Sequence, residues 1–296
     1  MIAQPRCITC IRNKQTQRAE QIADLERRKL FLRAINKILE DYGKTESAPA
    51  LSARADQAYS SCCGSSEDYS FIKESYNRLL LSMERELEEK IMHSRQPIRE
   101  CIKYVCAANY IDFSAVKNVN TETLRQLFER AEKEELSEKE YTAFVSDLSN
   151  AKTLLYIVDN CGEIVLDKLL IRIIKKAYPE LAVNVLLRGE DVINDATLAD
   201  AEQTGMTAEA KCFSNGNGAP GTVIAWLSDE TKKLITSADM IIAKGQGNFE
   251  SLYGEGLNPY YMFLCKCEMY VERFGLTQFS SVFTKEEHIR DLRLNG

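Results

Sequence analysis

Residues Thr153–Glu163 read TLLYIVDNCGE, an apolar run that ends abruptly in polar residues and a glycine. A short apolar run of this kind is typical of a strand that is buried on both faces of a parallel sheet. The stretch Ile164–Tyr178 that follows has an amphipathic, helical pattern, and Pro179 stops it. The segment therefore predicts a buried strand, a polar loop and a helix in succession.

The same alternation continues toward the C-terminus. Further strands are predicted at Ala182–Leu187, Lys211–Phe213, Asp239–Ala243 and Ser280–Thr284, and further helices at Ala196–Thr204 and Thr222–Thr236. The segment Tyr260–Val271 is apolar but has no clear period. Strands that alternate with helices form parallel sheets with right-handed crossovers. We therefore predict an α/β fold, a doubly wound Rossmann-like parallel sheet.

The first half of the chain has a different character. Apolar residues recur with a helical period over Gln15–Leu39, Asp68–Ile91, Ile98–Ala108, Thr121–Glu135 and Ser137–Leu148. No stretch before Ala151 has the pattern of a strand. This change predicts an all-helical N-terminal domain over residues 1–150 and an α/β core over residues 151–296.

The composition is that of an ordinary soluble globular protein, with 45% hydrophobic and 28% charged residues. The formal net charge of −6 argues against nonspecific binding to nucleic acid, which needs a basic surface. The apolar runs are far shorter than the ~20 residues that span a membrane, and the N-terminus lacks the apolar run of a signal peptide. We therefore expect a cytoplasmic protein that acts on neither nucleic acid nor membranes.

Histidine and cysteine offer little for a conventional metal site. The two histidines, His93 and His288, are too far apart in sequence for a His-rich zinc motif. Among the cysteines, Cys7 and Cys10 have CxxC spacing, which fits half of a metal site, a redox pair or simple packing. Acid–base and metal chemistry must therefore come mainly from carboxylates, amides and lysine.

Polar, glycine-containing loops follow four of the predicted strands, where parallel α/β sheets bind their ligands. Asp159 and Asn160 follow the first strand, and Asp195 lies in the next crossover. Such hard oxygen ligands suit Mg²⁺ or Mn²⁺. After the fourth strand, Lys244 precedes a Gly-rich helix start, an arrangement that often holds phosphate. The loops together predict a carboxylate-held metal beside a phosphate site.

Each of these features also has another explanation. Asp195 could cap the helix that follows it, and Asp159 and Asn160 could form an ordinary turn. The loop Gly216–Gly221 matches the GxGxxG dinucleotide pattern, but it follows the third strand, so a substrate-lining loop or a plain turn is favoured. Asp159 could also be a phosphorylated nucleophile, but Cys161 stands where such enzymes usually carry a second Asp, which favours attack by water.

The sequence contains, in this order, Asp159-Asn160-x-Gly162-Glu163, Asn194-Asp195-Ala196-Thr197 and Lys244-Gly245-x-Gly247-Asn248. Taken together, these three motifs resemble those of the metal-dependent damage-control phosphatases, the ARMT1-like family. Cys7 and Cys10 fit the CxxC of the prokaryotic branch of this family. Asn109–Phe113 resembles the stretch that joins its helical part to the sheet. The resemblance extends from about residue 7 to about residue 267.

The resemblance implies a helical region on a Rossmann-like core, with a divalent ion (Mn²⁺, Mg²⁺, Co²⁺ or Ni²⁺) held by Asp159, Asn160 and Asp195. These three residues and Lys244 are the expected catalytic residues. The residues expected to bind substrate are Glu163, Gly245, Gly247, Asn248 and Lys266, the last in place of an Arg-Thr-x-Lys motif of a eukaryotic branch.

These features predict a phosphomonoester hydrolase that releases phosphate from small phosphorylated metabolites, such as sugar phosphates, by metal-activated water. Phosphate monoesters hydrolyse very slowly without a catalyst, and a divalent ion both neutralises phosphoryl charge and activates water. Two alternatives stay open. One is an S-adenosylmethionine-dependent protein-carboxyl methyltransferase that uses Glu163 and the Gly216–Gly221 loop, and the other is a metabolite-binding module without enzymatic activity.

Overall fold

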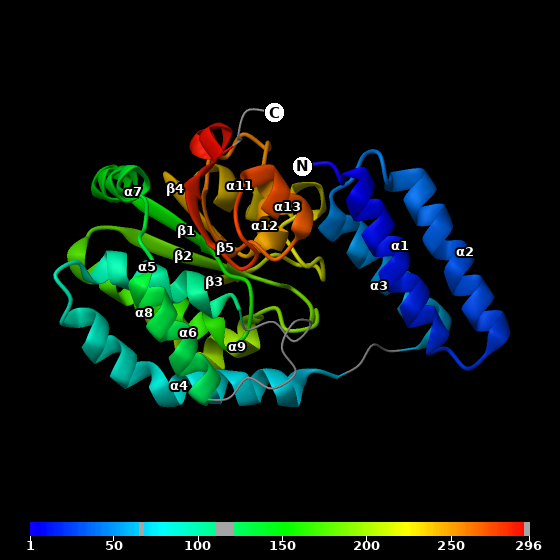
Figure 1. Ribbon diagram of the computed structural model, residues 1–296, viewed down its shortest axis with the longest axis horizontal. Helices are drawn as coiled ribbons and strands as arrows, with labels where there is room; N and C mark the ends of the chain where they lie inside the picture. The colour runs from blue at the N-terminus through cyan, green and yellow to red at the C-terminus, as the bar shows by residue number, and fades with distance from the viewer. Residues whose placement is uncertain (65–67, 111–120, 293–296) are drawn as a thin grey trace.

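The computed structural model describes residues 1–64, 68–110 and 121–292. Within these residues, six strands form one sheet in the order β3-β2-β1-β4-β5-β6 (Figure 1). The strands are β1 (Thr153–Ile157), β2 (Ala182–Leu187), β3 (Lys211–Ser214), β4 (Met240–Lys244), β5 (Tyr260–Leu264) and β6 (Ser281–Lys285). All neighbours are parallel except β6, which is antiparallel to β5. The predicted Rossmann-like α/β class is confirmed.

Helices fill the N-terminal half and the crossovers of the sheet. Before the sheet come α1 (Pro5–Glu20), α2 (Leu25–Tyr42), α3 (Ala48–Cys63), α4 (Ser70–Met92), α5 (Pro97–Ala108), α6 (Thr121–Lys133) and α7 (Glu138–Asn150). Between the strands come α8 (Glu163–Ala177), α9 (Leu198–Thr204), α10 (Met206–Glu209), η1 (Ile224–Trp226), α11 (Asp229–Thr236), α12 (Gln246–Leu252) and α13 (Glu268–Phe274), and η2 (Glu286–Leu292) follows β6.

The central strand β1 is buried on both faces, as its apolar sequence predicts. Leu154 and Tyr156 lie in the hydrophobic core that α4, α5 and α8 share with the sheet. Leu155 and Ile157 point the opposite way, into the core formed with α11, α12 and α13. Because side chains alternate along a strand, one short apolar run supplies both cores.

The N-terminal helices do not form one unit. Helices α1, α2 and α3 pack around their own core, which includes Phe31 and Leu51, and stand to one side of the sheet (Figure 1). Helices α4 and α5 instead pack against α8 and share the core on that face of the sheet. Helices α4–α7 thus build their core together with the strands. The division into two domains at residue 150 stays a prediction.

Two stretches predicted as single helices have other boundaries than their apolar period suggests. The stretch Gln15–Leu39 is split, because the Asp24 side chain accepts hydrogen bonds from the next turn and starts α2 there. In the stretch Thr222–Thr236, the helix α11 begins only after Ser228, whose hydroxyl accepts from the Thr231 amide. Capping side chains, rather than apolar periodicity, decide both boundaries.

The strand order reverses at β1, because its neighbours β2 and β4 extend the sheet in opposite directions. Crevices at such a reversal, outside the carboxyl ends of the strands, are where ligands of open α/β sheets bind. The fold therefore directs attention to the loops that begin at Asp159 and Gly245. No helix in the described ranges combines the length and apolar character needed to cross a membrane.

Phe144 of α7 tests how strongly the helical half depends on the sheet. Its buried ring packs edge-on against Tyr260 and Phe283, with centroids 5.1 and 5.4 Å away. Phe144→Ala should lower the free energy of unfolding by about 3–5 kcal/mol, because it leaves a cavity between α7 and the sheet. Urea unfolding followed by circular dichroism measures this change.

The matched control is Phe71→Ala on α4, where the phenylalanine is 76% exposed. This variant should stay within about 0.5 kcal/mol of the parent protein. Equal effects of the two substitutions would contradict the packing of α7 described above.

Candidate active site

The loops after β1 and β2 are joined by backbone hydrogen bonds. Asn160 and Asp195 form an isolated antiparallel bridge. The Ala196 amide donates to the Asp159 carbonyl over 2.7 Å, and the Cys161 amide donates to the Asn194 carbonyl over 2.8 Å. The structure thus brings Asp159, Asn160 and Asp195 together, although Asp195 is far from the other two in the sequence.

Arg188 follows β2 directly and lies between the two carboxylates, with only 2% of its surface exposed. Its Nε donates to Asp195 Oδ2 over 2.5 Å, and its Nη2 lies 3.5 Å from Asp159 Oδ1. Within the described residues, Nη2 makes no hydrogen bond. No sequence motif marks Arg188 as a site residue, although a cation directly after an apolar parallel strand is a usable signal.

Asn160 is held by its neighbours in a fixed orientation. Its Nδ2 donates to Asp159 Oδ2 and Glu163 Oε2, and its Oδ1 accepts from Asn194 Nδ2 over 2.7 Å. An amide oxygen has two lone pairs, so Oδ1 can accept this bond and still coordinate a cation. Asn109, which follows α5, also donates to Asp159 Oδ2 and Glu163 Oε2, each over 3.0 Å. The helical region therefore contributes a side chain to the site.

Lys244 has a different environment from the expected phosphate site. Side chains alternate along β4, so Lys244 points to the same face as Met240 and Ile242, toward α8. There the fully buried ammonium is paired with Glu163 and lies 2.9 Å from Asp167 Oδ1. In the structure, the cation beside Asp159 and Asp195 is therefore Arg188, and Lys244 neutralises carboxylates beneath the site.

Glu163, expected to bind substrate, is completely buried. Its two carboxylate oxygens are used by Lys244 on one side and by Asn109 and Asn160 on the other. In the structure Glu163 therefore links the buried lysine to the amides that contact Asp159. The Glu163 side chain is not exposed at the surface of the site.

The Gly-rich start of α12 is packed against the site. Gly245 has φ +81°, and a Cβ there would lie 2.0 Å from Asp159 Oδ2, so only glycine fits. A Cβ at Gly247 would lie 2.1 Å from the Pro220 carbonyl oxygen. Asn248 donates to the Val158 carbonyl and accepts from Arg188 Nη1. This segment therefore fixes the positions of Asp159 and Arg188.

The Gly216–Gly221 loop serves as packing for α12. A Cβ at Gly221 would lie 2.3 Å from Ser251 Oγ and 2.6 Å from the Gly247 carbonyl oxygen.

Lys266 follows β5 and is half-buried. Its positive charge favours the ionised form of Asp159 and so acts to lower the pKa of that carboxyl, against the larger effects that raise it.

The simpler explanation for Asp195, a helix cap, is wrong. Helix α9 begins at Leu198, and the residue that precedes it, Thr197, forms a reciprocal capping box with Asp200. Asp195 lies outside this cap and is paired with Arg188.

The largely buried site carries an excess of negative charge. Four carboxylates (Asp159, Glu163, Asp167 and Asp195) surround two cations (Lys244 and Arg188), which leaves a charge of −2 when all are ionised. Burial, with the charges of Asp195 and Glu163, raises the pKa of Asp159 to about 8. Burial likewise raises the pKa of Asp167 to about 6. A divalent cation would balance this charge.

The donor set therefore fits a divalent ion on charge and on ligand type. Two carboxylates and an amide oxygen meet at one edge of the sheet, which suits Mg²⁺ and Mn²⁺, and further ligands would be water or phosphate. Across the described chain, no three His, Cys, Asp or Glu side chains form a ready-made metal cage.

Other predicted features lie elsewhere. Cys7 and Cys10 are free thiols in the first turns of α1. Ile111, Asp112 and Phe113 of the Asn109–Phe113 motif lie outside the described residues.

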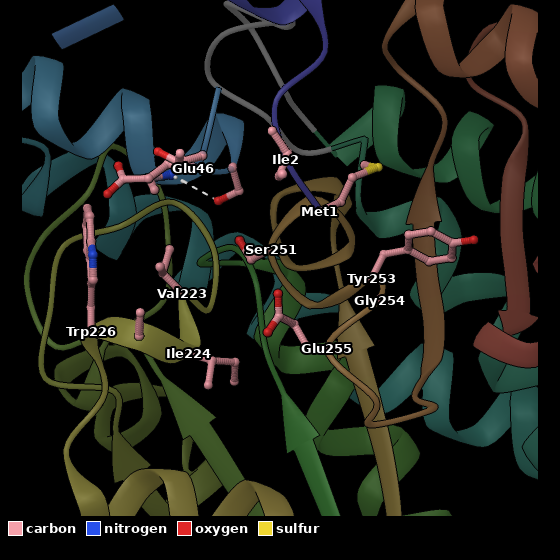
Figure 2. Close-up of a pocket in the computed structure, with 14 residues that line it drawn as sticks. Met1, Ile2, Glu46, Val223, Ile224, Trp226, Ser251, Tyr253, Gly254 and Glu255 are labelled. Atoms are coloured by element: carbon pink, nitrogen blue, oxygen red, sulfur yellow. Dashed lines mark hydrogen bonds between the residues drawn. The ribbon is translucent and has the colours of Figure 1, made fainter. Parts of the chain in front are cut away.

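A cavity of about 440 Å³ opens near the C-terminal end of α12, where Trp226, Ser251 and Glu255 line it (Figure 2). None of the predicted site residues lines that cavity.

Comparisons with known proteins point to one family. The family model described as the damage-control phosphatase ARMT1-like domain matches residues 3–282. An uncharacterised protein of Methanocaldococcus jannaschii is 30% identical over 292 residues, which cover 95% of this chain and 94% of that protein. A damage-control phosphatase of Archaeoglobus fulgidus is 28% identical, with 92% and 95% covered.

A solved structure shares the fold. The crystal structure of a DUF89 family protein from Pyrococcus horikoshii superposes with a TM-score of 0.75, covering 97% of this chain and 99% of that one. The two sequences are 24% identical in this superposition, so the likeness shows a common fold.

The raised pKa of Asp159 predicts how stability depends on pH in the absence of metal. The unfolded chain releases this proton near its ordinary pKa of 3.8, whereas the folded chain keeps it up to about pH 8. The resulting stabilisation is complete below about pH 4 and is lost as the pH rises toward 8. Asp159→Asn mimics the protonated acid, so its stability should fall less over this window.

Thermal unfolding midpoints measured in EDTA between about pH 5 and pH 8.5 test this expectation. The parent protein should lose more stability than Asp159→Asn across the range. Identical pH slopes for the two proteins would show that Asp159 ionises normally.

Proposed function

The chain belongs to the ARMT1-like damage-control phosphatase family, and on this basis we propose that it is a divalent-metal-dependent phosphatase of small phosphorylated metabolites. The observation that carries the proposal is the pairing of Asp159 and Asp195 around Arg188, in a largely buried site that holds four carboxylates and two cations. Such a site is suited to one divalent cation together with a phosphate group.

Asp159, Asn160 and Asp195 would hold the ion. When bound, a divalent ion neutralises phosphoryl charge and lowers the pKa of a water nucleophile. Asn109 and Asn160 donate to Asp159 Oδ2, and this fixes the direction of the carboxylate before any ligand arrives. Preorganised oxygen atoms of this kind do not have to be reoriented during the reaction.

Arg188 would bind the phosphoryl group. Its guanidinium is fixed by Asp195, Thr222 and Asn248, while Nη2 makes no hydrogen bond within the described part of the chain. A planar guanidinium with unused donors is well suited to phosphate oxygens, and its charge stabilises negative charge that develops in the transition state. Lys266, expected from the sequence to contact substrate, adds positive charge from its half-buried position.

Attack by water is favoured over a phosphorylated aspartate. Enzymes of the latter kind usually use a second acid two residues after the nucleophile. Here that residue is Cys161, which is fully buried, with a pKa raised well above the ordinary value mainly by burial. Such a neutral thiol cannot replace a carboxylic acid as proton donor at ordinary pH.

The substrate class, the metal and the location extend this proposal. We propose sugar phosphates or related metabolites as substrates and Mn²⁺, Mg²⁺, Co²⁺ or Ni²⁺ as the ion, in the cytoplasm. Phosphate release from a metabolite panel, measured with the four metals in parallel, identifies the preferred pair.

Asp159→Ala should reduce hydrolysis of p-nitrophenyl phosphate to the rate observed without added metal, because it removes one of the two carboxylates that hold the ion. Colorimetric turnover with each of the four metals measures this loss. Asp229→Asn, which changes an exposed carboxylate on α11, is the control and should retain full turnover.

Metal-dependent turnover that survives Asp159→Ala would contradict the assignment. If the parent protein releases no phosphate with any metal but binds S-adenosylmethionine in calorimetric titration, the methyltransferase alternative would replace it. Thermal stabilisation by a metabolite without phosphate release would indicate a binding module.

Arg188→Gln separates phosphate binding from metal binding. It should lower kcat/KM for p-nitrophenyl phosphate by about 100-fold or more, because a buried donor and charge are lost. The affinity for Mn²⁺ should be unchanged or higher, because Asp159 and Asp195 lose a competing cation. Steady-state kinetics and Mn²⁺ titration measure the two effects.

Arg33→Gln, which changes an exposed arginine on α2, is the matched control and should alter neither quantity. An Arg188→Gln variant with parental kcat/KM would rule out the phosphate role.

A further inference from the structure

Asn77 of α4 is completely buried and connects two loops that carry the site. Its Oδ1 accepts a hydrogen bond of 2.6 Å from the backbone amide of Gly162, in the loop that contains Asp159 and Asn160. Its Nδ2 donates to Asp200 Oδ1 over 2.8 Å, just after the loop that contains Asp195, and to Gln203 Oε1 over 2.7 Å. One side chain outside the sheet thus contacts both ligand-bearing segments.

The partner carboxylate, Asp200, is itself fixed. Its Oδ2 accepts from the amide and hydroxyl of Thr197, over 2.8 and 2.9 Å, and thereby caps α9. Lys73 of α4 lies 2.9 Å from the same oxygen and is only 4% exposed. A movement of Asp200 would therefore shift the cap of α9 at Thr197, which closely follows Asp195.

The other end of the connection is equally constrained. Gly162 has φ +70° and directly precedes α8, so the direction of its amide is set by the turn that follows Cys161. Without Asn77, this buried N–H would lose its hydrogen-bond partner, and the loop would have to move to find another, because an unpaired buried donor is unfavourable. Asp159 and Asn160 lie in that loop.

We propose that Asn77 is a positioning residue, which sets the separation between the Asp159–Asn160 loop and the Asp195 loop and so the affinity of the site for its divalent ion. This inference rests on the proposed function. In this proposal α4, in the helical half of the chain, contributes to metal binding through Asn77.

The test exchanges the two groups of the hydrogen bond and measures Mn²⁺ binding from the electron paramagnetic resonance signal of free Mn²⁺. Asn77→Asp places two carboxylates face to face, and Asp200→Asn places two amide groups there. Each single change should raise the Mn²⁺ dissociation constant by about 10- to 100-fold, the usual effect of losing a group that orients metal ligands.

The double variant Asn77→Asp with Asp200→Asn restores the pairing of one amide with one carboxylate, now in the reverse order. The carboxylate introduced at position 77 can still accept from the Gly162 amide. The amide oxygen introduced at position 200 can still accept from Thr197. The Gln203 side-chain amide, whose oxygen accepts from Asn77 in the parent protein, turns to present its Nε2 to the new carboxylate. The dissociation constant should therefore return to within about threefold of the parental value, because the contacts between the two loops are present again.

Met83→Ala is the structural control, because Met83 is a buried residue of α4 in the hydrophobic core. It should lower the unfolding midpoint and leave Mn²⁺ affinity unchanged. Parental affinity in both single variants would overturn the inference, as would a double variant no better than the single ones.

The parent protein and Asp159→Ala separate this outcome from failure of the proposed function. If the parent binds Mn²⁺ and Asp159→Ala does not, the site is established and only the role of Asn77 is in question. If the two proteins bind Mn²⁺ alike, the proposed function fails and the inference fails with it.

Discussion

The arrangement of this molecule depends on keeping four carboxylates close together in a largely buried site with only two cations. Charges removed from water are costly unless they are paired and hydrogen-bonded. Lys244 is therefore placed between Glu163 and Asp167, and Arg188 between Asp159 and Asp195. A divalent ion would neutralise the negative charge that these two cations leave unbalanced.

The helical half of the chain takes part in this arrangement. Asn109 at the end of α5 contacts Asp159 and Glu163, and Asn77 of α4 contacts the segments that follow Asn160 and Asp195. Both side chains are fully buried amides that donate to carboxylates. The helical half of the chain therefore contacts the site through these hydrogen bonds, in addition to its packing against the sheet.

Parts of this structure could not be read from apolar periodicity. The segment Tyr260–Val271 contains the strand β5 and part of α13, and β5 is buried on both faces, so it has no alternating pattern. Asn77 lies within an amphipathic helix and has no motif that marks it. Arg188 is marked only by its position at the end of an apolar strand, and it belongs to none of the three family motifs.

The α/β class, most strands of the core and the oxygen-bearing residues at their carboxyl ends follow from the sequence alone, because short apolar runs and polar loops are local features. Which charge meets which depends instead on the three-dimensional arrangement. Lys244 points toward α8 because side chains alternate along β4. Its partners Glu163 and Asp167 belong to α8, which is far from Lys244 in the sequence. Arg188 meets Asp159 because β1 and β2 are neighbours in the sheet. Such pairings depend on which faces and strand ends are adjacent, and the order of residues along the chain does not encode that directly.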